Sequence, residues 1–168
     1  ITKYTFHAMI VPTIARRPLV AYELVVVALV ATGFLSFGLW VHHMFTTGLP
    51  AMSLGFFSAA SMAVAIPSGI QVFAWIATLA AGKPRINVPA LFIFGFFFIF
   101  VAGGLTGVMV AMMPFDWQAH DTYFVVAHLH YVLFGGSILG ILGGLYYWWP
   151  KFFGRMLDER LGKIQFGL

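Results

Sequence analysis

Four long apolar segments, almost free of charge, dominate this chain and leave few folds open to it. They cover residues 19–45, 54–81, 90–113 and 122–149. A helix needs about 20 apolar residues to cross a bilayer, so each segment is long enough to span one. Only 8% of the 168 residues are charged, against about 25% in soluble domains. The sequence therefore predicts an all-α membrane protein built as a bundle of about four transmembrane helices.

The segments that flank these spans alternate in charge. Residues 1–18, 82–89 and 150–168 are basic, residues 46–53 carry no charge, and residues 114–121 hold two aspartates. Under the positive-inside rule, the basic segments face the cytoplasm or its equivalent. We therefore expect both ends of the chain on the inner side. These loops account for the net charge of +4, and no nucleic-acid partner is predicted.

The two ends of the chain favour an internal piece of one larger polytopic membrane domain. The chain starts at Ile1 without an initiator Met and turns apolar again near its end. We expect residues 1–18 to form a polar lead-in and a further helix to start near 160–168.

Two histidines, His128 and His130, lie one residue apart inside the fourth apolar segment. On an α-helix, two positions correspond to about 200° of rotation, so their imidazoles should point to opposite sides. Ionisable groups inside a span are costly and usually functional, and single imidazoles are common axial ligands of haem iron. The pattern predicts two separate haem ligands. The alternative, two core histidines bonded to carbonyls, is less favoured.

A second pair, His42 and His43, lies near the outer end of the first span. Adjacent helical side chains diverge by about 100°, which lets both flank one ion between them. The chain has no cysteine, and imidazole suits copper. His128 lies about 12 Å below the outer loop at 1.5 Å per residue, so the two groups should occupy the same half of the membrane. An interfacial histidine pair near the headgroups is the alternative.

Two further polar groups could carry chemistry, and Pro67 is expected to bend the second span. His120 and Asp121 open the fourth span, where Asp121 is expected to cap the helix and both could bind a hard cation. Ser68, Gln71 and Thr78 share one face of the second span. That polar stripe is explained equally by interhelical hydrogen bonds or by a wetted proton path from the inner side.

Four segments resemble, in order and spacing, the catalytic subunit I of the haem–copper oxidase family, the cytochrome c oxidase type. Residues 120–136 read HDTYFVVAHLHYVLFGG and residues 40–48 read WVHHMFTTG. Residues 65–79 read AIPSGIQVFAWIATL and residues 103–111 read GGLTGVMVA. The chain is similar to the seventh to tenth helices of a twelve-helix subunit.

The resemblance implies a role for each matching residue. His42 and His43 match two ligands of a CuB-type copper ion. His128 matches the axial ligand of the high-spin haem iron, and His130 matches one axial ligand of the low-spin haem iron. His120 and Asp121 match the ligands of a magnesium or manganese ion.

The resemblance also implies reaction, cofactors and partners. It implies oxygen reduction to water with electrons from cytochrome c, coupled to proton translocation, and two haems of the a type. Expected partners are the other oxidase subunits, notably subunits II and III, in a bacterial inner membrane or a mitochondrial inner membrane. The third copper ligand, the second low-spin ligand and one acidic proton-path residue are not in this chain, so the fragment alone should not be active.

Gln71 stands where the family's proton path carries a lysine, and Ser68 stands where it carries a threonine. Glutamine holds water but does not titrate, so this member is expected to feed protons differently or less well. Among the haem–copper oxidases, a quinol oxidase is the alternative to a cytochrome c oxidase. A histidine-containing proton transporter or channel is the alternative from a different class, and a remnant that no longer binds haem is a third.

Overall fold

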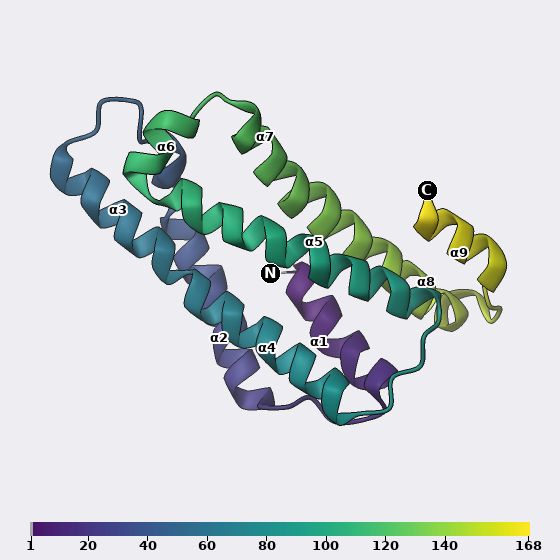
Figure 1. Cartoon of the computed structure of the whole chain (residues 1–168). Helices are drawn as coiled ribbons and strands as arrows, with labels where there is room; N and C mark the ends of the chain where they lie inside the picture. Colours follow the sequence, from purple (N-terminus) through teal and green to yellow (C-terminus); the bar gives the residue numbers. More distant parts are fainter. Residues whose placement is uncertain (1) are drawn as a thin grey trace.

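The chain is an integral membrane protein of helices. A computed structural model describes residues 2–168, and no strand occurs among them. Four helical stretches are long and apolar enough to cross a membrane: Tyr22–Met44, Ala51–Ala81, Val88–Ala111 and Tyr123–Phe153. The prediction of an all-α bundle with about four transmembrane helices is confirmed (Figure 1).

Three of the four spans change helix type or break along their length. The first joins α2 (Tyr22–Gly38) to the 3-10 helix η1 (Trp40–Met44). The second joins α3 (Ala51–Ala63) to α4 (Ala65–Ala81), and α5 (Val88–Ala111) is continuous. The fourth runs through α7 (Tyr123–His130), the π-helix η2 (Tyr131–Ile138) and α8 (Leu139–Phe153).

The short helices include one element that the sequence analysis missed. Residues Thr2–Ala15 form helix α1, so the expectation of a polar lead-in over residues 1–18 is wrong. Ile10 and Val11 of α1 are fully buried, and this burial in the bundle accounts for the helix. The remaining short helices are α6 (Met113–Ala119) and α9 (Glu159–Gly167).

Helix α5 is the centre of the bundle. It contacts α8, η2, α7, α6, α3, α9, α4 and α1. Its aromatic side chains Phe96, Phe97 and Phe100 form a buried cluster with Trp75 of α4 and with apolar residues of α1. Burying aromatic rings from three helices at one point fixes where these helices cross.

A proline and a glycine account for two local features of the fold, a helix break and a close helix–helix contact. The break between α3 and α4 falls at Val64, three residues before Pro67, because a proline has no N–H for the preceding turn. In η2, a Cβ added to Gly135 would lie 1.9 Å from the Ile99 side chain of α5. Glycine at this position therefore permits the close approach of η2 and α5.

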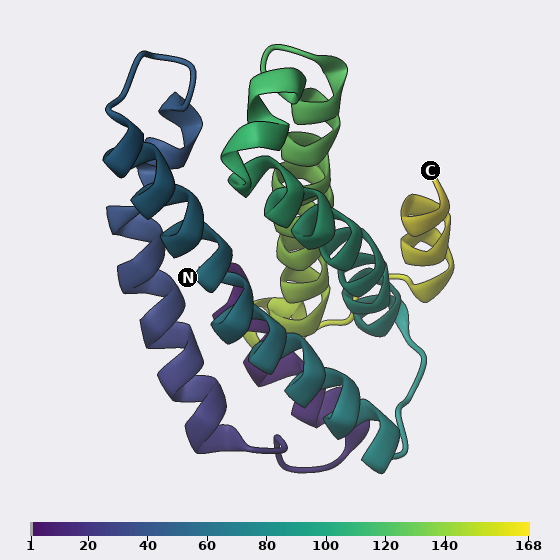
Figure 2. The ribbon, with the colours of Figure 1, turned by 60° about the vertical axis from the view of Figure 1, so that its left-hand side comes forward.

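The two ends of the bundle carry different connections. Figure 2 shows the loop before α3 and the helix α6 at one end, and the α1–α2 turn and the α4–α5 connection at the other. From the positive-inside rule, we expect the first end to be the outer end and the second to be the inner end. The candidate site lies toward the outer end.

Candidate metal and haem site

His128 points from α7 toward α5. Its Nδ1 lies 3.0 Å from the carbonyl oxygen of Gly103 and 3.2 Å from Thr106 Oγ1. A carbonyl only accepts, so Nδ1 carries the hydrogen and donates it, and Nε2 keeps its lone pair. Histidines that bind metals typically donate their other ring N–H to a backbone carbonyl in this way. The Nε2 lone pair of His128 is therefore left available.

The place of this imidazole is set by a glycine on α5. A Cβ added to Gly107 would lie 2.9 Å from Cε1 of His128. Any side chain at position 107 would have to displace the ring. Gly104, on the same helix, has no atom within 4 Å of an added Cβ.

His130 points the other way. It is exposed on the side of the bundle and stacks on Phe134, with ring centroids 5.0 Å apart and planes 8° apart. Its Nδ1 lies 2.7 Å from the carbonyl oxygen of Val126, so it too donates from Nδ1 and keeps the Nε2 lone pair. The two histidines thus face opposite sides of α7, as the helical spacing requires.

The first histidine pair lies on the 3-10 helix η1 at the outer end of the first span. The His42 and His43 ring centroids are 4.3 Å apart. His42 Nδ1 lies 3.0 Å from Ser61 Oγ of α3, which fixes the orientation of that ring. His43 packs against Trp40 at 4.8 Å between centroids.

The histidines of η1 and α7 approach each other. His128 interacts electrostatically with both His42 and His43. Within residues 2–168, however, no three His, Asp or Glu side chains come together tightly enough to bind one metal ion. A complete ion site on these histidines would need a further ligand.

A third polar group lies between α6 and α7. His120 Nδ1 is 3.7 Å from Asp116 Oδ2, and His120 Nε2 is 3.7 Å from Asp121 Oδ1. Asp116 is buried, and its Oδ2 has no hydrogen-bond partner in the described part of the chain. Burial raises the pKa of the Asp116 carboxyl above its ordinary value, while His120 and His43 act in the opposite direction.

Asp116 is the site residue that the sequence analysis missed. It lies four residues before His120, the spacing that brings two side chains together on one helical turn. The role expected for Asp121 as a helix cap is wrong. The Thr122 hydroxyl accepts from the Phe124 N–H at 3.3 Å, and Asp121 is 93% exposed with a φ of 57°. Asp121 has a left-handed backbone conformation, and Thr122 holds the N-cap position of α7.

The polar stripe on α4 is largely buried. Gln71 and Thr78 are fully buried, and Ser68 is half-buried. Gln71 Nε2 donates to Thr32 Oγ1 of α2 at 3.1 Å and to the Pro67 carbonyl at 3.2 Å. Gln71 Oε1 has no partner among the described residues.

The Thr78 hydroxyl, in contrast, is fully engaged. It donates to the Ala74 carbonyl at 2.6 Å and accepts from the Val20 N–H at 2.9 Å. Thr78 therefore holds the segment before α2 against α4, and it can pass a proton only when one of these bonds breaks.

Another buried histidine lies away from this site. His7 of α1 stacks on Phe96 at 3.6 Å between ring centroids and lies 5.4 Å from the Trp75 ring. Phe96 precedes Gly107 by 11 residues on α5, or about 16 Å at 1.5 Å per residue. His7 therefore belongs to the aromatic core and does not join His42, His43 and His128.

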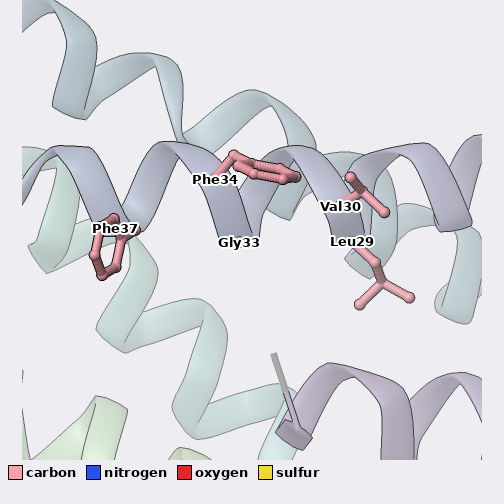
Figure 3. Close-up of a pocket in the computed structure, with 5 residues that line it drawn as sticks. All are labelled: Leu29, Val30, Gly33, Phe34 and Phe37. Carbon is pink, nitrogen blue, oxygen red and sulfur yellow. The ribbon is translucent and has the colours of Figure 1, made fainter.

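A shallow groove on α2 has no ligating group. It is lined by Leu29, Val30, Gly33, Phe34 and Phe37, all apolar (Figure 3). Such a lining suits an apolar chain or ring and excludes this groove as the metal centre.

The fold and the histidine geometry together define a class of protein. It is a membrane-embedded helical bundle in which His128 and His130 donate Nδ1–H to backbone carbonyls and keep Nε2 unprotonated, a state that metal and haem proteins use for their ligands. Residues 2–168 match the family model described as Cytochrome C and Quinol oxidase polypeptide I, and the chain belongs to that family.

Curated relatives agree with this assignment. The chain is 49% identical over 157 residues to cytochrome c oxidase subunit 1 of Synechocystis sp., with 94% of this chain and 28% of the relative covered. It is 49% identical over 159 residues to the Bacillus subtilis subunit, with 95% and 26% covered. It is 46% identical over 159 residues to the Thermostichus vulcanus subunit, with 95% and 29% covered. The chain thus spans between a quarter and a third of the length of these relatives.

Proposed function

We propose that this chain is part of the catalytic subunit of a respiratory terminal oxidase, which reduces oxygen to water and couples the reaction to proton translocation. The observation that carries the proposal is the opposed pair on α7. His128 and His130 face opposite sides of one helix, and each donates Nδ1–H to a carbonyl, which keeps Nε2 for a metal. Two iron ligands on one helix would hold two haems close to each other, an arrangement that suits electron transfer between them. Family membership makes the transporter or channel alternative unfavoured.

The residues fit the cofactors of such an oxidase. His128 would hold the high-spin haem iron, His130 the low-spin haem iron, and His42 with His43 the active-site copper. When bound, the haems and the copper supply the electron-transfer and oxygen chemistry. The chain itself contributes fixed imidazoles, a glycine that makes room for one of them, and burial within an apolar bundle. The a type of haem is part of this proposal.

The polar group between α6 and α7, which consists of Asp116, His120 and Asp121 and which we call the outer polar group, is proposed to bind a magnesium or manganese ion. His120 and Asp121 supply an imidazole and a carboxylate, and the buried Asp116 oxygen adds a second carboxylate beside His120. Carboxylate oxygens are the ligands that such cations prefer. The remaining ligands would come from outside this chain.

The proposed partners follow from the same assignment. They are oxygen, the other oxidase subunits including subunits II and III, and an electron donor. The relatives are named as cytochrome c oxidases, which favours cytochrome c over a quinol. The proposed location is a bacterial inner membrane or a mitochondrial inner membrane.

Gly107 offers a sharp test of the His128 assignment. Gly107→Ala places a Cβ 2.9 Å from the His128 ring and should displace the imidazole, so the high-spin haem content of the full-length oxidase should fall about tenfold. Gly104→Ala is the matched control, because its Cβ meets no atom within 4 Å. Haem content is measured by optical spectra of the purified protein. Equal haem content in the two variants would contradict the assignment.

Gln71 is proposed to belong to an inner proton path together with Ser68 and Thr78. Gln71→Leu removes the buried amide and should slow proton uptake during turnover by roughly tenfold or more. Thr32→Val is the control, since it breaks the same hydrogen bond between α2 and α4 but leaves the amide in place. Proton uptake is followed with a pH-sensitive dye in single-turnover experiments. Equal slowing in both variants would assign Gln71 to helix packing alone.

A further inference from the structure

At the inner end of the bundle, two connections that are far apart in sequence are fastened together. Lys83 N donates to the Ala15 carbonyl at 2.9 Å, and Arg85 N donates to the Ile14 carbonyl at 3.2 Å. Figures 1 and 2 both show the α1–α2 turn beside the α4–α5 connection. Two backbone hydrogen bonds fix the relative position of these segments.

These two backbone hydrogen bonds, which we call the clamp, depend on Gly82. A Cβ added at that position would lie 2.3 Å from the Ala15 carbonyl oxygen and 2.9 Å from the Ala15 Cβ. Backbone atoms cannot move aside as a flexible side chain does. Glycine at position 82 is therefore required for the two connections to touch.

The clamp gathers positive charge. It brings together the exposed residues Arg16, Arg17, Lys83 and Arg85, which we call the inner basic cluster. Arg17 has a structural task, since its Nη1 donates to the Ala81 carbonyl at the C-terminus of α4 at 3.0 Å. For the other three, no carboxylate lies within ion-pair distance in the part of the chain that the structure describes.

Two acidic residues on neighbouring elements, Glu159 and Glu23, do not neutralise the cluster. Glu159 accepts from the Val88 N–H at 3.0 Å and pairs with Lys163 at 3.9 Å. Glu23, in the first turn of α2, forms no ion pair among the described residues. Orienting a membrane protein requires only that basic residues be on the inner side. It does not require that they be held together by a clamp.

The position of the cluster identifies its partner. The spans end at Ala81 and begin at Tyr22 and Val88, so these cations lie within a few residues of the apolar core, at headgroup depth. Exposed apolar side chains flank them: Tyr22, Leu24 and Ile86 are 65%, 50% and 68% exposed. A ligand that fits must carry a negative charge next to apolar chains.

We propose that the inner basic cluster is a binding site for the phosphate of an anionic phospholipid. The guanidinium groups and the Lys83 ammonium receive the phosphate, and the acyl chains run along the exposed apolar faces of α2 and α4. Basic pockets between transmembrane helices on the inner side bind anionic headgroups in this way.

The test measures binding of phosphatidylglycerol to the delipidated full-length oxidase by native mass spectrometry. The triple variant Arg16→Gln, Lys83→Gln, Arg85→Gln should lower the affinity by about fivefold per charge, or about 100-fold. A second triple variant, Lys151→Gln, Arg155→Gln, Arg160→Gln, removes the same inner-side charge elsewhere and should change it by less than about twofold. Gly82→Ala keeps every charge and should also weaken binding, because it separates the two connections.

Several results would overturn this proposal. They are unchanged phosphatidylglycerol affinity in the first triple variant, an equal loss in the second, and equal binding of phosphatidylcholine. Displacement of the lipid by inorganic phosphate would assign the cluster to the free anion instead. If the triple variant does not assemble, Lys83→Gln alone leaves both backbone bonds in place and should give about a fivefold loss; no loss there would count against the site. Haem spectra report correct folding throughout and do not depend on the lipid.

Discussion

Replacing His128 by alanine in the full-length oxidase should abolish the high-spin haem signal and lower oxygen reduction by more than about 100-fold. The imidazole is held by hydrogen bonding of its Nδ1 to the Gly103 carbonyl, so its Nε2 is presented in one fixed direction. Alanine has no nitrogen lone pair to bind the iron, and the space beside Gly107 that the imidazole ring occupies is left empty. Optical spectra and oxygen consumption of the purified protein measure the two effects.

His130→Ala is the matched comparison for this variant. It lies two residues away on the same helix and faces the opposite side, so it should remove the low-spin haem signal and leave the high-spin haem bound. A reciprocal loss of the two signals would separate the two roles. A His128→Ala protein that kept its high-spin haem would contradict the assignment.

The second large effect is expected at the copper. His42→Asn and His43→Asn should each reduce copper from about one ion per protein to near zero, because the site loses one of its few imidazole ligands. Both haems should remain, since neither residue is proposed to ligate iron. Elemental analysis of the purified protein measures copper and iron in the same sample.

Ser61 refines this test. Its Oγ lies 3.0 Å from His42 Nδ1, so Ser61→Ala should free the ring and weaken copper binding about tenfold without removing a ligand. Ser36→Ala, at an exposed position of α2, should have no effect. Full copper retention in His42→Asn would rule out His42 as a ligand.

The spans were predictable because a membrane imposes one simple condition. Every backbone polar group must be paired within the lipid, so long apolar segments can only be helices. The opposed directions of His128 and His130 followed from helical geometry alone. Both inferences needed only local sequence.

Other features depend on contacts that local sequence does not carry. Helix α1 was missed because its apolar stretch is short and is followed directly by Arg16 and Arg17, and because its burial comes from packing against α4, α8 and α5. The π-helix η2 is a change in hydrogen-bond register that hydropathy does not report. Asp116 joins the outer polar group through its burial and its position beside His120. Thr122, and not Asp121, caps α7, and Asp121 has a left-handed backbone conformation.

The central proposal is that this chain carries ligands for two haems and a copper in an oxidase. The most direct test is the reduced-minus-oxidised optical spectrum of the full-length protein, recorded with and without carbon monoxide. The proposal predicts two haem contributions, one low-spin and unchanged by carbon monoxide, and one high-spin that shifts when it binds. A spectrum without haem bands, or a spectrum of a single six-coordinate haem that does not bind carbon monoxide, would contradict the proposal.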